Sequence, residues 1–90
     1  MMLVLPDRLT HAQATSCLLG LRDGLGSEMG EASVVDAGAL REFDSAALAV
    51  LLQLRRDCLI LGRSFTVRGM PARLADLAHL YGIGELLPQA

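Results

Sequence analysis

The stretch VVDAGALREFDSAAL, residues 34–48, decides the fold of this chain. It begins as a buried strand, continues as a loop and ends with Asp44 and Ser45 at the start of a long apolar helix. A hydroxyl at a helix N-terminus lies where four backbone N–H groups lack intrahelical acceptors and where the helix dipole is positive. Ser45 is therefore placed to cap the helix, to accept a phosphate, or to contact an acidic or carbonyl-rich partner.

On both sides of this stretch, hydrophobic periodicity and turn residues predict strands and helices in alternation. The strands are expected over residues 2–5, 32–36 and 64–68. The first helix is expected to begin at Thr10, with Gln13 in a capping box, and to end at the glycines 24, 26 and 30. The second is expected to begin at Asp44 or Ser45 and to end at Gly62. The third is expected to begin at Pro71 and to end at Gly82. An apolar tail, residues 83–88, is expected to pack back on the sheet.

This order of elements predicts an α/β fold with a mostly parallel sheet of three to four strands and about three helices. Ninety residues form one domain, residues 1–90. The adjacent Val34 and Val35 favour a central strand that is covered on both faces.

The helix that begins near Ser45 is expected to have two different faces. The face expected on the sheet consists of Leu48, Leu51, Leu52, the stem of Arg55, Cys58 and Leu59. The opposite stripe consists of Ser45, Ala46, Ala49, Gln53, Arg56, Asp57 and Ile60, with Val50 and Leu54 at its margins. This stripe is either an ordinary solvated face or a platform of small residues on which a partner approaches Ser45. The apolar margins favour the platform.

Charge and composition exclude several classes of function. A net charge of −2, scattered arginines and only 3% aromatic residues argue against nucleic-acid binding. The apolar N-terminus stops at Pro6 without a basic region, and the run 46–54 is too short to span a bilayer, so the chain is expected to be soluble and cytoplasmic. The 52% hydrophobic content indicates that part of the apolar surface serves as a docking patch.

No group of residues predicts catalysis. His11 and His79 fall on helix surfaces without a patterned Asp or Ser partner, and no glycine-rich phosphate loop is present. Cys17 and Cys58 are expected to be small buried hydrophobes. Asp36 and Asp44 both follow the carboxyl edge of the sheet, where two carboxylates can form a weak metal site, but capping of backbone N–H groups around Ser45 is the favoured role. We therefore predict no enzyme activity, no cofactor and no metal.

The residues Val35-Asp36, the segment FDSAAL at 43–48 and the leucine-rich helix after it resemble the signature of STAS domains, the small sulphate-transporter and anti-anti-sigma-factor domains. LAVLLQL at 48–54, FTVRG at 65–69 and LAHLYGI at 77–83 are similar to one branch. That branch is the cytoplasmic STAS subunit of the Mla ABC transporter, which maintains outer-membrane lipid asymmetry in Gram-negative bacteria. The resemblance covers residues 32–88 by motif and residues 1–30 by pattern.

The resemblance implies a four-stranded sheet with helices mainly on one side. It also implies a non-enzymatic accessory subunit that binds the ATPase subunit of the transporter and meets the inner membrane only through that partner. The implied partner-binding residues are Asp44, Ser45, Ala46, Ala49 and Gln53, supported by Asp36 and Ala47. The anti-anti-sigma branch implies an alternative, an anti-sigma factor antagonist that binds a kinase-type anti-sigma factor and is regulated by phosphorylation of Ser45.

Two features depart from the family pattern. Ala47 stands where the family has a glycine, so its methyl group is expected to reshape the partner contact slightly. The family also has a strand before the one at residues 2–5. Either the sequence starts too late to include that strand, or the sheet is one strand short; in the second case an exposed edge is expected, through which two copies of the chain can pair as a homodimer.

Overall fold

The computed structural model describes residues 2–27 and 32–89 and contains a parallel three-stranded sheet at its centre. The strands β1 (Met2–Val4), β3 (Ala32–Asp36) and β5 (Ser64–Arg68) lie in the order β1-β3-β5. Leu3, Val35 and Val67 are in register across the three strands and are all buried. The predicted α/β fold with a mostly parallel sheet is confirmed.

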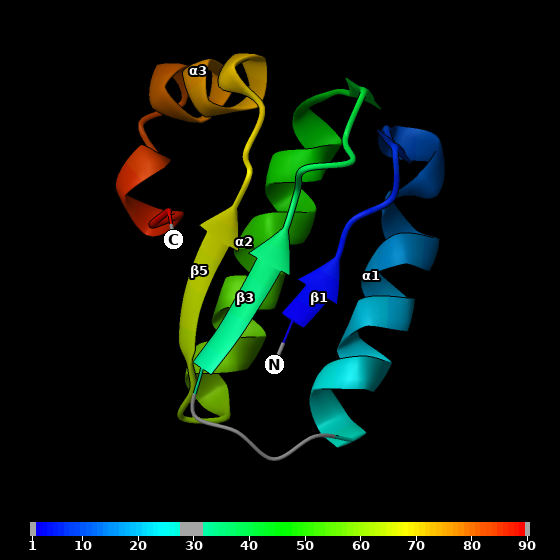
Figure 1. Ribbon diagram of the computed structural model, residues 1–90, viewed down its shortest axis with the longest axis vertical. Helices are drawn as coiled ribbons and strands as arrows, with labels where there is room; N and C mark the ends of the chain where they lie inside the picture. The colour runs from blue at the N-terminus through cyan, green and yellow to red at the C-terminus, as the bar shows by residue number, and fades with distance from the viewer. Residues whose placement is uncertain (1, 28–31, 90) are drawn as a thin grey trace.

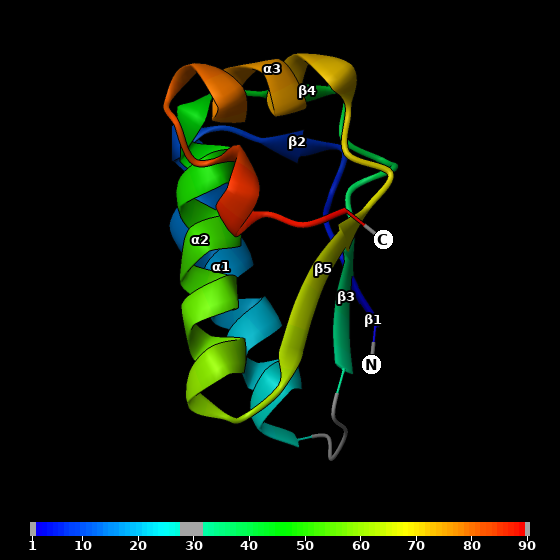
Figure 2. The same ribbon diagram turned by 90° about the vertical axis from the view of Figure 1, so that its left-hand side faces the viewer.

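The long helices cover one face of this sheet. Both α1 (His11–Ser27) and α2 (Ser45–Ile60) begin at the carboxyl edge of the sheet and run back along it side by side (Figures 1 and 2). The shorter α3 (Ala72–Leu80) crosses that edge. No helix among the described residues covers the other face of the sheet, where Met2 and Val4 are exposed. The expectation that β3 is covered on both faces is therefore wrong, and the half-buried Val34 points to the open side.

The helix boundaries follow the capping residues. Thr10 precedes α1, and its backbone N–H donates to Gln13 Oε1 at 3.0 Å, as the capping box predicts. The helix continues through Gly24 and Gly26 to Ser27 instead of ending at these glycines, because each glycine weakens a helix by only about 1 kcal/mol. Gly30 lies outside the described residues. Pro71 is the N-cap of α3 and precedes its first turn instead of lying in it.

The C-terminal segment packs on the edge of β5, as expected for an apolar tail. A short 3-10 helix, η1 (Gly84–Leu86), follows α3, and Leu87 after it is buried. The backbone N–H of Val67 donates to Pro88 O at 2.8 Å, and Gln89 forms a parallel bridge with Val67. The tail thus covers the edge of β5, whereas β1 pairs only with β3 among the described residues.

The buried face of α2 differs from the predicted one. The buried residues of this helix are Ala47, Leu48, Val50, Leu51, Leu54 and Cys58. Val50 and Leu54, expected at the margin of an exposed stripe, are in the core, and Leu59 is exposed. The buried face is rotated by roughly a quarter of a turn from the predicted one. The cause is that α2 packs against α1 as well as against the sheet, so its core-facing side points between them.

Candidate protein-interaction site

The site is built on Asp44, whose carboxylate caps two helices. Asp44 is the N-cap of α2, and its Oδ1 accepts a hydrogen bond from Ala46 N at 2.8 Å. Its Oδ2 accepts a second one, at 3.0 Å, from the backbone N–H of His11, which is the first residue of α1. One side chain therefore holds the N-termini of both long helices together at the carboxyl edge of the sheet.

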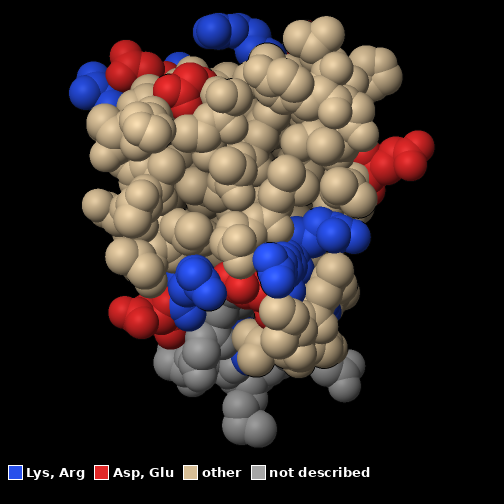
Figure 3. Space-filling model, turned by 180° about the vertical axis from the view of Figure 1, so that it is seen from behind, with Lys and Arg blue, Asp and Glu red and all other residues tan. Residues whose placement is uncertain are grey.

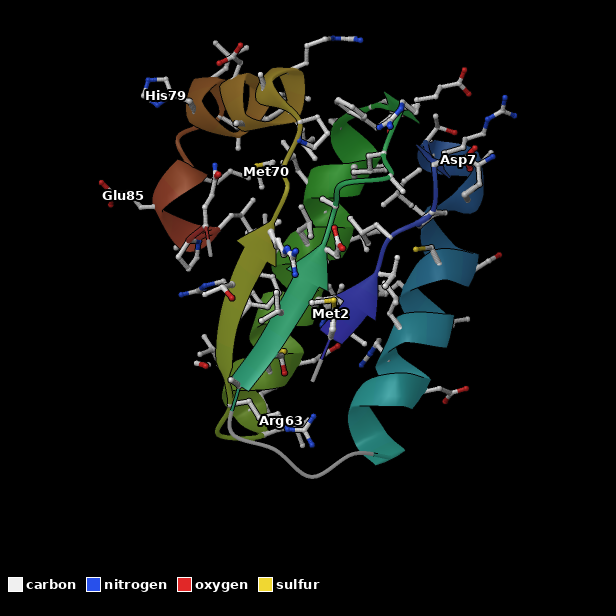
Figure 4. The ribbon with its side chains drawn as sticks, viewed as in Figure 1. Met2, Asp7, Arg63, Met70, His79 and Glu85 are labelled. Carbon is white, nitrogen blue, oxygen red and sulfur yellow. The ribbon has the colours of Figure 1, made fainter. Side chains whose placement is uncertain are left out.

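A second, two-stranded sheet positions these helix ends. The loop before α1 contributes β2 (Arg8–Leu9), and the loop before α2 contributes β4 (Glu42–Phe43), paired in parallel. The backbone N–H groups of Arg41 and Glu42 donate to Asp7 O at 2.8 and 3.0 Å, beside the start of α1 (Figure 4). Leu9 of β2 is fully buried. The two loops thus form one layer that fixes the spacing of the helix N-termini.

The environment of Asp44 favours its ionised form. The hydrogen bonds from the backbone N–H groups of His11 and Ala46 lower the pKa of Asp44 below its ordinary value of 3.8, and the charge of His11 lowers it further. Asp44 is exposed, so its carboxylate carries a charge at neutral pH while it stays in contact with solvent. The helix dipoles of α1 and α2 favour this negative charge.

Ser45 is the first residue of α2 and is exposed to solvent. Of the two capping alternatives left open by the sequence, the structure selects Asp44, which accepts the hydrogen bond from Ala46 N. The Ser45 hydroxyl is consequently not required as a cap. It is presented at the surface, at the junction of two helix N-termini, where it can meet a partner or a phosphoryl donor.

The other predicted partner-binding residues of α2 are Ala46, Ala49 and Gln53. Ala49 is exposed, whereas Ala46 and Gln53 are half-buried. Gln53 Nε2 donates to Asp57 Oδ1 at 3.1 Å, and Asp57 Oδ2 pairs with Arg22 Nε of α1 at 2.8 Å. The polar half of the platform is therefore tied to α1. A hollow of about 250 Å³ lies between α1 and α2. Its lining residues are Ala14, Thr15, Leu18, Ala49, Val50 and Gln53.

The two supporting residues, Asp36 and Ala47, have structural roles. Asp36 Oδ1 accepts a hydrogen bond from Gly38 N at 2.8 Å, so it stabilises the turn after β3 and does not join Asp44. Ala47 is fully buried, so its methyl group lies in the core. The methyl group therefore does not lie on the surface of the described structure, and its expected effect on the partner contact stays a prediction that could act only through the packing of α2.

Other chemistry at the surface is sparse. Within residues 2–27 and 32–89, no three His, Cys, Asp or Glu side chains are grouped as metal ligands. Cys58 is buried and burial raises the pKa of the half-buried Cys17, as expected for structural thiols. Near Ser45, Arg73 of α3 lies 5.5 Å from the ring centroid of Phe43, beside a second hollow of about 320 Å³. None of the described helices combines the length and hydrophobicity needed to cross a bilayer.

His11 is a member of this site that the sequence pattern does not predict. The pattern gives it no acidic partner, yet its backbone N–H donates to Asp44, 33 residues later. Two signals together could have revealed the contact. The Thr10–Gln13 capping box fixes His11 as the first residue of α1, and the parallel order of strands places the starts of both helices at one edge.

Comparison with known protein families gives a match that includes all residues of this site. A family model described as "Mlab, STAS domain" matches residues 1–88. No curated protein matches the chain. The family match includes β2, β4 and the starts of both long helices, so the complete site lies within it.

Proposed function

Because the chain belongs to the STAS domain family, whose members are generally non-enzymatic regulatory or accessory interaction domains, we propose that it is an accessory subunit of a lipid-trafficking ABC transporter. In this role it binds the ATPase subunit of an Mla-type system that maintains outer-membrane lipid asymmetry. The observation that carries the proposal is the exposed Ser45 hydroxyl at the junction of two helix N-termini, which Asp44 holds together.

The geometry supports a protein partner better than a small ligand. Ser45 and Ala49 are one helical turn apart on α2 and are both exposed, so a partner surface can approach the α2 backbone closely there. The β2–β4 layer and the Asp44 cap fix the position of this edge before any partner arrives. A preorganised edge loses little conformational entropy on binding, which favours affinity. Ala46 and Gln53 complete the proposed contact, and the membrane is reached only through the partner.

The test is co-purification of the chain with the ATPase subunit, followed by an ATPase assay. Ser45→Glu is expected to abolish co-purification, because the added carboxylate would be desolvated at the contact without a partner. Folding is expected to be retained, since an acidic residue in the first turn of a helix is favoured by the dipole. Ala72→Glu is the matched control, because it places the same residue at the exposed first position of α3. Equal binding by the two variants would refute the proposed contact.

One observation favours a second candidate function, that of an anti-sigma factor antagonist. The exposed hydroxyl of Ser45 is accessible to a kinase, and a helix N-terminus stabilises an added phosphate. Phosphorylation would then release a kinase-type anti-sigma factor, because a dianion is costly to desolvate. Intact mass spectrometry of the chain from stressed cells, compared with Ser45→Ala, tests this function. An unmodified mass, with no binding to an anti-sigma kinase, contradicts it.

A further inference from the structure

The exposed sides of α1 and α2 carry no formal charge over their first three turns. Residues 9–21 and 45–54 contain no Asp, Glu, Lys or Arg. We call the shared surface of these turns the helical face; its exposed or half-buried residues are Ala12, Thr15, Leu19, Ser45, Ala49 and Leu52. Figure 3 shows a broad uncharged area on this side of the molecule, with acidic and basic residues at its margins. Solvated helix faces are normally charged, so this surface has the character of an interface core.

The shape of the helical face suits packing against another helix. Thr15 and Ala49 line the hollow of about 250 Å³ between α1 and α2. Leu19, which is 58% exposed, lies one helical turn after Thr15. The hollow between α1 and α2 has room for an aliphatic side chain, and Leu19, which does not line the hollow, offers such a side chain on the exposed side of α1. The face therefore offers both a ridge and a groove, the two elements that helices need to pack on each other.

The charges at its two ends identify the occupant as a second copy of the same chain. Asp44 stands at one end of the exposed stripe of α2, and the exposed Arg56 ends the same stripe about 18 Å away. A twofold axis that packs two copies of α2 antiparallel places Asp44 of each copy opposite Arg56 of the other. Both ion pairs form at once, on either side of an uncharged centre.

We propose that the helical face is a homodimer interface with this antiparallel arrangement. The molecule measures 32 × 25 × 18 Å, and α1 and α2 lie on one of its two broadest sides, so the helical face is on a broad side and not at a narrow end. The dimer covers Ser45. If the proposed function is correct, self-association and binding of the ATPase subunit exclude each other, so the free subunit is kept in an inactive, protected form.

The first experiment measures the mass of the chain alone by sedimentation velocity over a wide range of concentrations. A concentration-dependent dimer is expected for the wild type. Ala49→Arg, which brings two like charges together near the twofold axis, should weaken dimerisation by at least about tenfold. Ala72→Arg is the matched control, since it changes an exposed alanine of α3, and it should dimerise like the wild type. Thr15→Arg repeats the test from α1, with circular dichroism as the check of folding.

A second experiment tests the orientation. Residue 50 is midway between Asp44 and Arg56 in the sequence, so Ala49 is the exposed position nearest the axis. Ala49→Cys should form a disulfide-linked dimer under mild oxidation, and Ala72→Cys should not. A wild-type chain that is monomeric at all concentrations overturns the inference. So does a dimer that tolerates Ala49→Arg, as one formed through the open edge of β1 would. Neither result affects the proposed contact with the ATPase subunit, which is tested with the partner present.

Discussion

The carboxylate of Asp44 accepts a hydrogen bond from the backbone N–H of His11 and so joins two helices that are far apart in the sequence. An N-cap normally serves only its own helix, and Asp44 does this as well through Ala46 N. The two bonds make the starts of α1 and α2 one structural unit. Since Ser45 follows directly, the exposure of its hydroxyl depends on this double cap.

Asp44→Ala is expected to destabilise both helix N-termini, because two backbone donors lose their acceptor. The matched control is Thr10→Ala, which removes only the hydroxyl that donates to Gln13 Oε1 beside α1, keeps the backbone bond to Gln13, and is expected to cost about 1 kcal/mol. Urea unfolding should show a larger loss for Asp44→Ala than for Thr10→Ala. Hydrogen exchange should show faster exchange at His11 and at Ala46 in the Asp44 variant. Protection at His11 equal to that of the wild type would contradict the double cap.

The same cap predicts a dependence of stability on pH. The pKa of Asp44 is lower in the folded chain than its ordinary value of 3.8, so its contribution to stability is fully present above that value. The contribution is lost as the pH falls through the pKa of the folded state. We expect the difference in unfolding free energy between the wild type and Asp44→Asn to shrink over this range, because the amide does not titrate. A difference that stays constant from neutral to strongly acidic pH would show that the carboxylate charge contributes nothing.

The sequence predicted the central elements well because their signals are local. The strands at 32–36 and 64–68 have the predicted boundaries, and Gly62, with φ of +72°, ends α2 as expected of glycine after a helix. The short strands β2 and β4 were not predicted, since two residues carry no periodicity. The buried side of α2 was misplaced because it depends on α1, which packs against α2 from another part of the chain. The contact between Asp44 and His11 was missed for the same reason.

Ser33 is expected to reduce the stability of the core. Its side chain is 1% exposed on the covered face of β3, and its Oγ has no hydrogen-bond partner among the described residues. A buried polar group without a partner keeps its desolvation cost. Ser33→Ala should therefore raise the free energy of unfolding by about 1 kcal/mol, measured by urea denaturation. Ser33→Thr, which keeps the hydroxyl, should bring no such gain; equal stabilisation by both variants would assign the effect to something other than the hydroxyl.

Gly69 is expected to be irreplaceable in the turn after β5. Its φ of +67° is costly for other residues, and a Cβ there would lie 3.1 Å from Gly38 Cα in the turn after β3. Gly69→Ala should therefore lose more than the roughly 1–2 kcal/mol of a left-handed alanine. Gly62→Ala is the matched control, because its φ is +72° but no atom lies within 4 Å of a Cβ. Thermal unfolding of both variants isolates the cost of the contact between the two turns, and equal losses would show that the turns adjust freely.

Ala47 stands where the STAS family has a glycine, and substitutions there test whether this position affects the core or the partner contact. Because its side chain is fully buried in α2, Ala47→Gly should lose the methyl burial, about 0.8 kcal/mol, in addition to about 1 kcal/mol of helix propensity. Ala49 of the same helix is exposed, so Ala49→Gly should lose only the contribution of helix propensity. Urea unfolding at low protein concentration compares the two variants. The affinity of Ala47→Gly for a partner should equal that of the wild type, since the residue does not reach the surface. A change in affinity without a change in stability would place residue 47 in the contact after all.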